Sequence, residues 1–222
     1  MDLRYMIFVM VALAIISFVI RIIGEKRRRT DLEALAAELG LEFQSGGDRE
    51  LRDRLSSFKL MSTGRSRRLD NLLRGQSAST TTAIFDYQYT SSSGKNSNTR
   101  RYTVFLMESD ELRLPSFSLE PEGFLHRLVA SLGWQDINFD THPEFSRMYQ
   151  LQGSDEESVR ELFQPGVLEY FEQHKGLCVE GNGNQLIVYY QGKRPRVDAI
   201  PGLMQDGLAV VGMLREAWIA GS

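Results

Sequence analysis

The chain has 222 residues, which is enough for one large domain or two small ones. Hydrophobic residues make up 42% and charged residues 25%, close to the globular average, which excludes a collagen, a disordered chain and a membrane protein with many spans. The single cysteine excludes a disulfide framework and a zinc site built from paired cysteines. The composition therefore indicates a globular protein, and its apolar residues are concentrated near the N-terminus.

The first element along the chain is an apolar helix. Residues 5–20 carry no charge, and beyond Arg21 the run continues through Ile22 and Ile23 to a total of nineteen residues. At a rise of about 1.5 Å per residue such a helix is roughly 28 Å long, which matches the hydrocarbon core of a bilayer. Because the run has no polar stripe, it predicts a transmembrane helix over residues 5–23 rather than a helix of a soluble core.

Basic residues lie mainly behind this apolar run. Arg4 alone precedes it, and the five that follow are Arg21, Lys26, Arg27, Arg28 and Arg29. This asymmetry predicts an anchor in the plasma (inner) membrane with the C-terminal part in the cytoplasm. The alternative is a cleaved signal peptide, which needs basic residues before the run and small residues at a cleavage site after it. Neither is present, so the sequence favours a retained anchor and basic stop over residues 1–29.

Residues 30–113 are predicted to form a membrane-proximal α+β part. Thr30 and Glu33 make a capping box, which predicts a short helix separate from the anchor. A short strand is expected over residues 41–44, and a charged helix over residues 48–56.

The middle of the chain predicts a β-hairpin. The basic stretch 64–75 fits either a turn or a short helix. Residues 80–90 and 102–107 alternate and are rich in β-branched and aromatic side chains, which is typical of strands, and Asp86 falls on the polar face. The polar residues 91–100 between them predict a long mobile loop at the hairpin tip.

Residues 114–222 are predicted to form a distal part in which helices and short strands alternate. The expected helices cover residues 121–132, 154–163, 165–171 and 200–220. The expected strands cover residues 136–139, 147–152, 177–180 and 185–190, and the last two flank an Asn182-Gly183 turn. The predicted fold class is therefore α+β with a mainly antiparallel sheet, divided into two subdomains near Leu114.

The charge of the soluble part bears on its partners. Residues 30–222 contain 20 basic and 27 acidic residues, which argues against nucleic acid as a partner. Residues 45–113 carry a net +4 and residues 114–222 a net −7, so either the basic side faces an anionic leaflet or the imbalance is a chance feature of a solvated surface. The candidate contacts with the membrane surface are Arg27, Arg28, Arg29, Arg65, Arg67, Arg68 and Arg74.

One segment holds a weak candidate for catalysis. Asp136, Asp140, His142 and Glu144 could supply metal ligands or an acid/base pair, with His126 or His174 as the further contributor from another segment. The structural alternative is a His142-Pro143 turn with acids that stay in solvent. Cys178 lacks a local cationic neighbour and fits a packed side chain. No nucleotide-binding motif occurs, and neither a cofactor nor a bound metal is predicted.

Four short motifs between residues 80 and 190 form a pattern. They are IFDYQY at residues 84–89, PSF at 115–117, PEF at 143–145 and GSDEESVRELF at 153–163. With the apolar N-terminal helix, they make the chain resemble a family of bacterial single-pass membrane-anchored proteins with a conserved domain of unknown function. The resemblance implies bacterial origin and membrane anchoring, and it implies no catalytic residue.

Two classes of function follow from the sequence. The first is a non-enzymatic binding or scaffolding module at the inner leaflet, whose partners are the lipid bilayer and a protein of unknown identity. The second is a membrane-tethered hydrolase that uses residues 136–144. Convergence of these side chains with His126 or His174 in a cleft would favour the enzyme, and their dispersal over the surface would favour the module.

Overall fold

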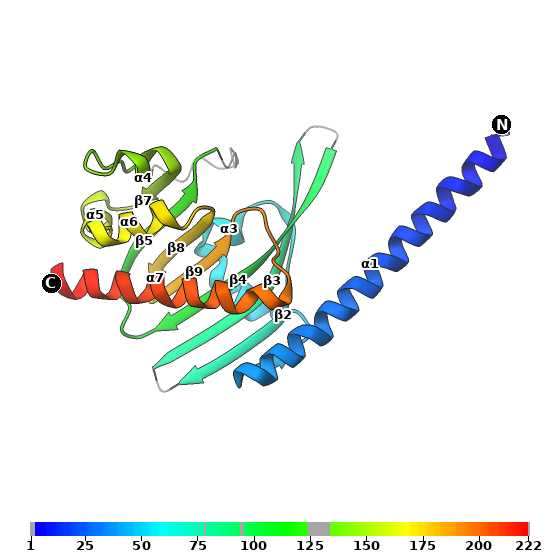
Figure 1. Ribbon diagram of the computed structural model, residues 1–222, viewed down its shortest axis with the longest axis horizontal. Coiled ribbons are helices and arrows are strands. Elements are labelled where there is room, and N and C mark those ends of the chain that lie inside the picture. Colours follow the sequence, from blue (N-terminus) through cyan, green and yellow to red (C-terminus); the bar gives the residue numbers. More distant parts are fainter. Residues whose placement is uncertain (1–2, 78, 94–95, 124–133, 222) are drawn as a thin grey trace.

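The structure, a computed structural model, describes residues 3–77, 79–93, 96–123 and 134–221. This part of the chain forms a long N-terminal helix, one nine-stranded antiparallel sheet and helices on both faces of the sheet (Figure 1). The α+β class with a mainly antiparallel sheet is therefore confirmed.

The elements have the following bounds. The helices are α1 (Leu3–Leu39), α2 (Arg49–Arg54), α3 (Lys59–Ser62), α4 (Pro143–Met148), α5 (Glu156–Leu162), α6 (Pro165–Gln173) and α7 (Ile200–Gly221), with short 3-10 turns η1 (Leu55–Ser57) and η2 (Val197–Ala199). The strands are β1 (Glu42–Gln44), β2 (Arg65–Ser77), β3 (Thr80–Ser93), β4 (Asn96–Ser109), β5 (Leu114–Pro121), β6 (Gln135–Asp136), β7 (Tyr149–Gly153), β8 (Leu177–Gly183) and β9 (Gln185–Tyr190). Their order in the sheet is β1-β2-β3-β4-β9-β8-β5-β7-β6.

Helix α1 is one unbroken helix of 37 residues. The expected break at Thr30 is absent, because helix-forming charged residues precede Thr30 and its hydroxyl donates to the carbonyl of Lys26 (3.4 Å). The apolar residues 5–23 are exposed, whereas Leu32, Leu35 and Ala36 are buried against the domain. The same helix therefore serves as an apolar span at one end and as a core helix at the other (Figure 1).

The basic stretch after Gly64 is neither a turn nor a helix but the long strand β2. Two interruptions hide it in the sequence. The pairing with β3 shifts register between Arg65 and Arg68 and again between Asp70 and Leu73. Ser66 and Asn71 have positive φ values of 53° and 52°. These irregularities destroy the period-two alternation by which a strand is predicted.

The hairpin of β3 and β4 is confirmed, and it is longer than expected. The two strands pair from Thr80↔Ser109 as far as Ser93↔Asn96, so most of the predicted loop over residues 91–100 is strand. This end of the hairpin projects beyond the body of the domain and has no core to pack against, which accounts for its Ser, Thr and Asn residues.

The distal elements agree with expectation in part. Strand β5 and helix α4 are additions, and α4 takes in the first two residues of the strand expected over residues 147–152. Pro121 ends β5 and does not begin a helix, and most of the helix expected after it falls on residues outside those described. Helix α5 is capped by Asp155, whose carboxylate accepts from the Ser158 amide, and not by Ser154. The pair Asn182↔Gln185 places the β8–β9 turn at Gly183 and Asn184, one residue later than predicted.

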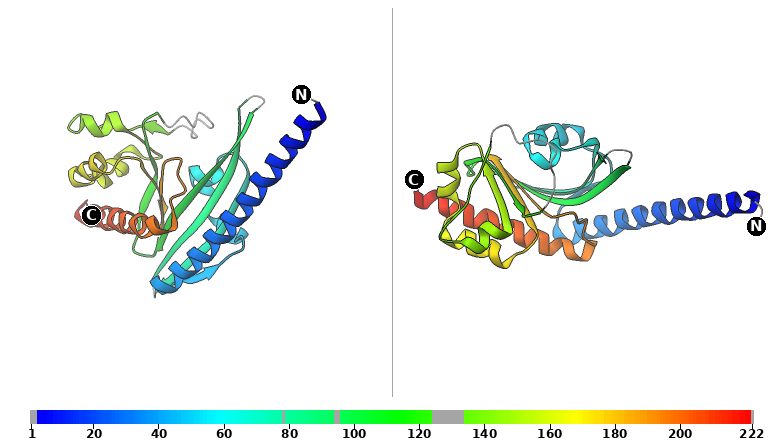
Figure 2. Two further views of the ribbon diagram at one scale, coloured as in Figure 1. Left: turned by 45° about the vertical axis from the view of Figure 1, so that its right-hand side comes forward. Right: turned by 90° about the horizontal axis from the view of Figure 1, so that it is seen from above.

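The sheet carries a different set of helices on each face (Figure 2). Helices α1, α5, α6 and α7 form one core with alternate strand residues such as Ile84 and Phe105. Helices α2 and α3 cover the other face of the sheet. They form the second core with the strand residues that point to that face, such as Phe85, Val104 and Leu106. Strand β4 pairs with β9, so one sheet crosses the point near Leu114, and the division into two subdomains there stays a prediction.

Two described helices are long and apolar enough to cross a membrane, Arg4–Leu39 and Val197–Ile219. The most apolar window of the first is entirely unburied, whereas a third of that of the second (33%) is buried. Leu203, Val210 and Leu214 of α7 are fully buried against the sheet. Helix α7 is therefore part of the core, and the described structure has one apolar helix, α1, that extends freely from the domain.

Candidate functional site

The four residues predicted as a catalytic or metal-binding set do not converge. Asp136, Asp140 and Glu144 are exposed and His142 is half-buried. Asp136 accepts hydrogen bonds from two glutamine side chains of β7 (3.1 and 2.7 Å), and Glu144 pairs with Arg147. His142 interacts through Nδ1 with the preceding threonine (3.0 Å). Among described residues, no hydrogen bond or ion pair joins two of the four.

The described members of the other candidates for chemistry, His174 and Cys178, have structural roles. His126 lies outside the described residues. The ring of His174 stacks on Tyr170 with 3.8 Å between centroids. Cys178 is buried, and burial raises the pKa of its thiol well above the usual range, so it is not an activated nucleophile. Within the described ranges, no group of three or more His, Cys, Asp or Glu side chains could hold a metal ion.

Most of the arginines predicted at the membrane surface are accessible. Arg27, Arg29, Arg65, Arg67 and Arg68 are exposed, and Arg74 is half-buried.

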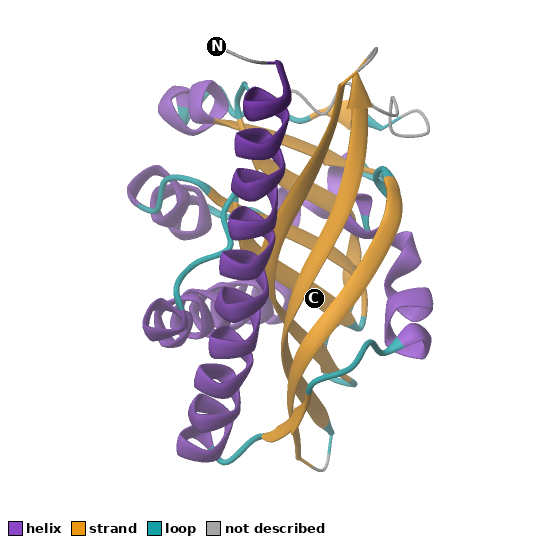
Figure 3. Cartoon of the chain, turned by 90° about the vertical axis from the view of Figure 1, so that its right-hand side faces the viewer, coloured by secondary structure: helices purple, strands orange, loops and turns teal. Residues whose placement is uncertain are grey.

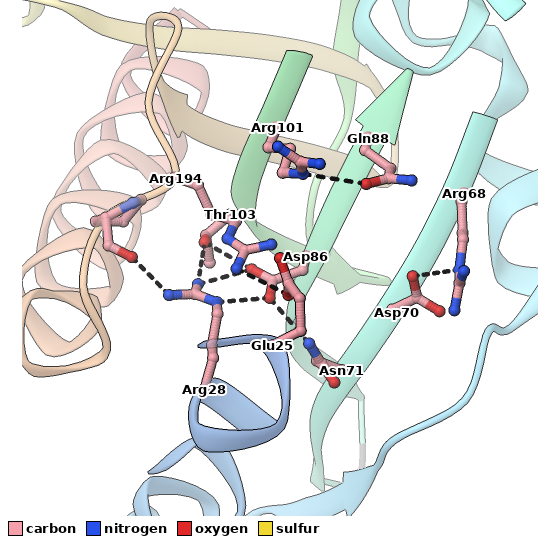
Figure 4. Close-up of polar contacts among 11 residues, drawn as sticks. Glu25, Arg28, Arg68, Asp70, Asn71, Asp86, Gln88, Arg101, Thr103 and Arg194 are labelled. Atoms are coloured by element: carbon pink, nitrogen blue, oxygen red, sulfur yellow. Dashed lines mark hydrogen bonds and ion pairs between the residues drawn. The ribbon is translucent and has the colours of Figure 1, made fainter. Parts of the chain in front are cut away.

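The prediction is wrong for Arg28, whose exposed fraction is only 8%. Its guanidinium points into the domain, where it pairs with an acidic side chain of the sheet. Asp86 of β3 accepts from Arg28 Nε and Nη2, each at 2.8 Å (Figure 4). A bidentate arginine–carboxylate pair of this kind is among the strongest polar contacts in proteins.

Three further partners complete this buried network. Thr103 Oγ1 donates to Asp86 (2.9 Å) and accepts from Arg28 (2.8 Å). Asn71 Nδ2 donates to Asp86 (3.0 Å), and Arg28 Nη1 donates to the Pro195 carbonyl (2.8 Å). The Asp86 carboxylate therefore accepts four hydrogen bonds from α1, β2 and β4. The network fixes α1 to the sheet immediately behind the apolar span.

A polar cavity of ≈ 220 Å³ opens beside this network, between α1 and the sheet. We call it the anchor cleft. Its lining residues are Arg21, Glu25, Arg29, Arg68, Asp70, Asn71, Asp86, Tyr87, Gln88, Arg101 and Arg194. Most of them are charged or amide side chains, so the cleft suits a polar ligand and not an apolar one.

Two walls of the cleft are set by regular structure. On α1, Arg21, Glu25 and Arg29 recur every four residues and so share one face of the helix. On the sheet, Arg68 pairs with Gln88, and Gln88 pairs with Arg101, so these three lie side by side across β2, β3 and β4.

The charge of the cleft is positive, since five arginines face three carboxylates and one of the three, Asp86, is already paired with Arg28. Arg68 pairs with Asp70, and Arg194 pairs with Glu25 (2.9 Å). Among the described residues, Arg21 and Arg29 have no acidic partner.

Two acceptors in the lining lack a hydrogen-bond donor. Asn71 Oδ1 and Asp70 Oδ1 are buried without a partner. Asn71 is only 6% exposed, and its amide group is oriented by its bond to Asp86. Unsatisfied buried acceptors are uncommon in native proteins.

A second buried polar cluster lies on the opposite face of the sheet. Glu180 accepts from the amides of Lys59 and Leu60 (2.5 and 3.0 Å) and from the Tyr189 hydroxyl (2.9 Å). Burial, and then the nearby Glu120, raise the pKa of Glu180 from 4.5 to about 7. These bonds attach α3 to β8, so the cluster is structural.

The sequence did not single out Asp86, Thr103, Asn71 or Arg194. One signal was available for the first two. Each is a polar residue between two aromatic or apolar neighbours in its strand, and the hairpin register places them directly opposite each other. A buried polar pair across two strands usually has a further partner, which here is Arg28.

The fold and the cleft define a class: an α+β domain carried on an apolar helix that suits membrane anchoring, with a basic cleft where the two meet. Among solved structures, it is similar to the crystal structure of the mycobacterial trehalose monomycolate transport factor A, TtfA. The TM-score is 0.60 and the identity 14%, over 87% of this chain and 94% of that one. This likeness shows a shared fold. No family profile and no curated protein matches the chain, and the resemblance to a membrane-anchored bacterial family stays a prediction.

Proposed function

We propose that the chain is a non-enzymatic binding module, held in the inner membrane by α1 with its domain in the cytoplasm. One observation carries the proposal: α1 continues without a break into the domain, where the buried Arg28–Asp86 pair holds it to the sheet. A tethered enzyme needs only a flexible linker, because its substrate arrives by diffusion. A continuous helix instead sets the height and orientation of the domain over the bilayer, which matters for binding a partner in the same membrane.

The arrangement of β2 and the hairpin supports this orientation. The tip of the β3–β4 hairpin lies toward the same end as the N-terminus of α1 (Figure 3). Arg65 pairs with Thr90 near this tip, whereas Arg74 pairs with Ala83, seven residues and about 23 Å further along β3 at 3.3 Å per residue. We therefore assign membrane contact to Arg65, Arg67 and Arg68 together with Arg27 and Arg29, and not to Arg74.

The shared fold supports the class of role. TtfA is named a transport factor. We extend to the present chain only the general part of that role, an accessory protein that binds a component of a membrane transport process.

The test uses the full chain in native membranes. A photo-crosslinking residue at Thr99, exposed near the hairpin tip, should form a defined adduct, and the same residue at Glu161 on α5 should not. A flexible Gly-Ser insertion after Gly24 leaves the Arg28–Asp86 pair intact but uncouples the domain from the span, so it should abolish the adduct. An adduct that survives the insertion would contradict the proposal. So would hydrolysis of ester or phosphoester substrates by the purified chain that D140N or H142A removes.

A further inference from the structure

The anchor cleft lies at the depth of the lipid headgroups if α1 spans the membrane. Arg21 is part of the span predicted over residues 5–23, and Glu25 and Arg29 follow it on the same face of the helix. The headgroup layer begins where the hydrocarbon core ends, which is at this level of α1. A ligand in the cleft therefore has direct access from the leaflet.

The cleft offers a place for a phosphate. Arg29 from α1 and Arg101 from β4 both line it, and neither has an acidic partner among the described residues. Guanidinium groups bind phosphate oxygens through paired, charge-assisted hydrogen bonds. The excess of arginines over carboxylates makes a phosphate the complementary charge.

The cavity of ≈ 220 Å³ is smaller than a typical pocket for a drug-sized molecule, so it admits a headgroup and leaves the acyl chains in the bilayer.

We propose that the anchor cleft binds the headgroup of an anionic phospholipid, with the phosphate against Arg29 and Arg101. The inference rests on the proposed membrane orientation, and it assigns a lipid ligand to the base of the binding module. It differs from general attraction to an anionic surface, because it requires the particular arginines that line the cleft.

The experiment measures lipid binding to the full chain in a neutral detergent by native mass spectrometry. Phosphatidylglycerol should bind at least tenfold more tightly than phosphatidylcholine. The double variant R29Q/R101Q should weaken phosphatidylglycerol binding at least tenfold. K26Q/R100Q removes the same charge from the same two elements, at exposed positions outside the cleft lining, and should change binding less than twofold.

Four results would overturn the inference. Equal binding of the two lipids would exclude headgroup selection, and equal loss in the two double variants would reduce it to net charge. Binding of phosphatidylethanolamine as tight as that of phosphatidylglycerol would exclude selection for an anionic headgroup. Displacement of the lipid by millimolar inorganic phosphate would assign the cleft to a free phosphate. Because this binding is measured in detergent without a partner, its failure leaves the crosslinking test of the binding module unaffected.

Discussion

The buried Arg28–Asp86 pair allows the sharpest prediction about the attachment of α1. Replacing Arg28 by Met keeps much of the side-chain volume but removes the charge and its hydrogen bonds. The Asp86 carboxylate then retains only the bonds from Thr103 and Asn71, while its side chain is only 7% exposed. The variant therefore leaves a buried carboxylate without the guanidinium that pairs with it.

The expected cost follows from this geometry. Both side chains are less than a tenth exposed, at 9% and 7%, so solvent screens little of the loss. Breaking a buried pair by removing one partner costs about 3–5 kcal/mol. Replacing both partners, as in R28M/D86L, should cost much less than the sum of the single changes, because no charge remains buried. R147M breaks the exposed pair with Glu144 and should cost about 1 kcal/mol or less.

Urea unfolding of the full chain in detergent micelles, followed by tryptophan fluorescence, measures these costs. With a slope of about 2 kcal/mol per molar urea, a loss of about 4 kcal/mol lowers the midpoint by about 2 M. Two results would refute the claim that the pair holds α1 to the sheet. One is a cost below about 1 kcal/mol for R28M. The other is a cost for R28M/D86L equal to the sum of the costs of R28M and D86L measured separately.

Three further predictions address the core, the helix packing and the topology. Because the folded-state pKa of Glu180 is raised from 4.5 to about 7, its stabilising contribution is complete below pH 4.5 and is lost as the pH rises toward 7. Wild type should therefore lose about 3 kcal/mol relative to E180Q across that window, and parallel pH–stability curves would contradict this. On α7, a Cβ at Gly207 would lie 2.3 Å from the Phe105 ring, so G207A should cost about 1–3 kcal/mol, whereas G212A, with open space, should add up to about 1 kcal/mol in the same unfolding assay. The buried native cysteine should not react with a membrane-impermeant maleimide, so E161C should be labelled only after the inner membrane is opened; labelling of intact cells would contradict the cytoplasmic assignment.

The elements that the sequence predicts well are those whose signals are local. The apolar span needs only hydropathy, the hairpin of β3 and β4 shows regular alternation, and α2 begins at an Asp48 cap whose carboxylate accepts from the Leu51 amide. Strand β2 has no such local signal, because its bulges at Ser66 and Asn71 interrupt the alternation by which a strand is predicted. The continuity of α1 has none either, because the capping-box sequence at Thr30 can occur inside a helix as well as at its start.

The candidate site was beyond such reasoning because it is assembled from distant segments. Arg28 and Asp86 are 58 residues apart, and Arg28 and Pro195 are 167 apart. Only the pairing of β3 with β2 on one side and β4 on the other brings Arg68 and Arg101 to either side of Gln88. Counting basic residues correctly found an arginine-rich segment behind the span, but it could not separate Arg28, which faces the sheet, from Arg27 and Arg29, which do not have its buried partner.

The rotation of α1 about its own axis determines three things: which residues enter the core, which one forms the buried ion pair, and which line the cleft. Leu32, Leu35 and Ala36 enter the core, Arg28 reaches Asp86, and Arg21, Glu25 and Arg29 line the cleft. At 100° per residue, all of these positions lie within about one third of the helix circumference. One face of α1 therefore changes from an apolar core contact, through a buried ion pair, to a charged cleft wall, and then to the apolar span. Because α1 is continuous, the contacts that hold the domain also determine which side chains of the anchor face the cleft. The fold thus orients the arginines of α1 toward those of the sheet.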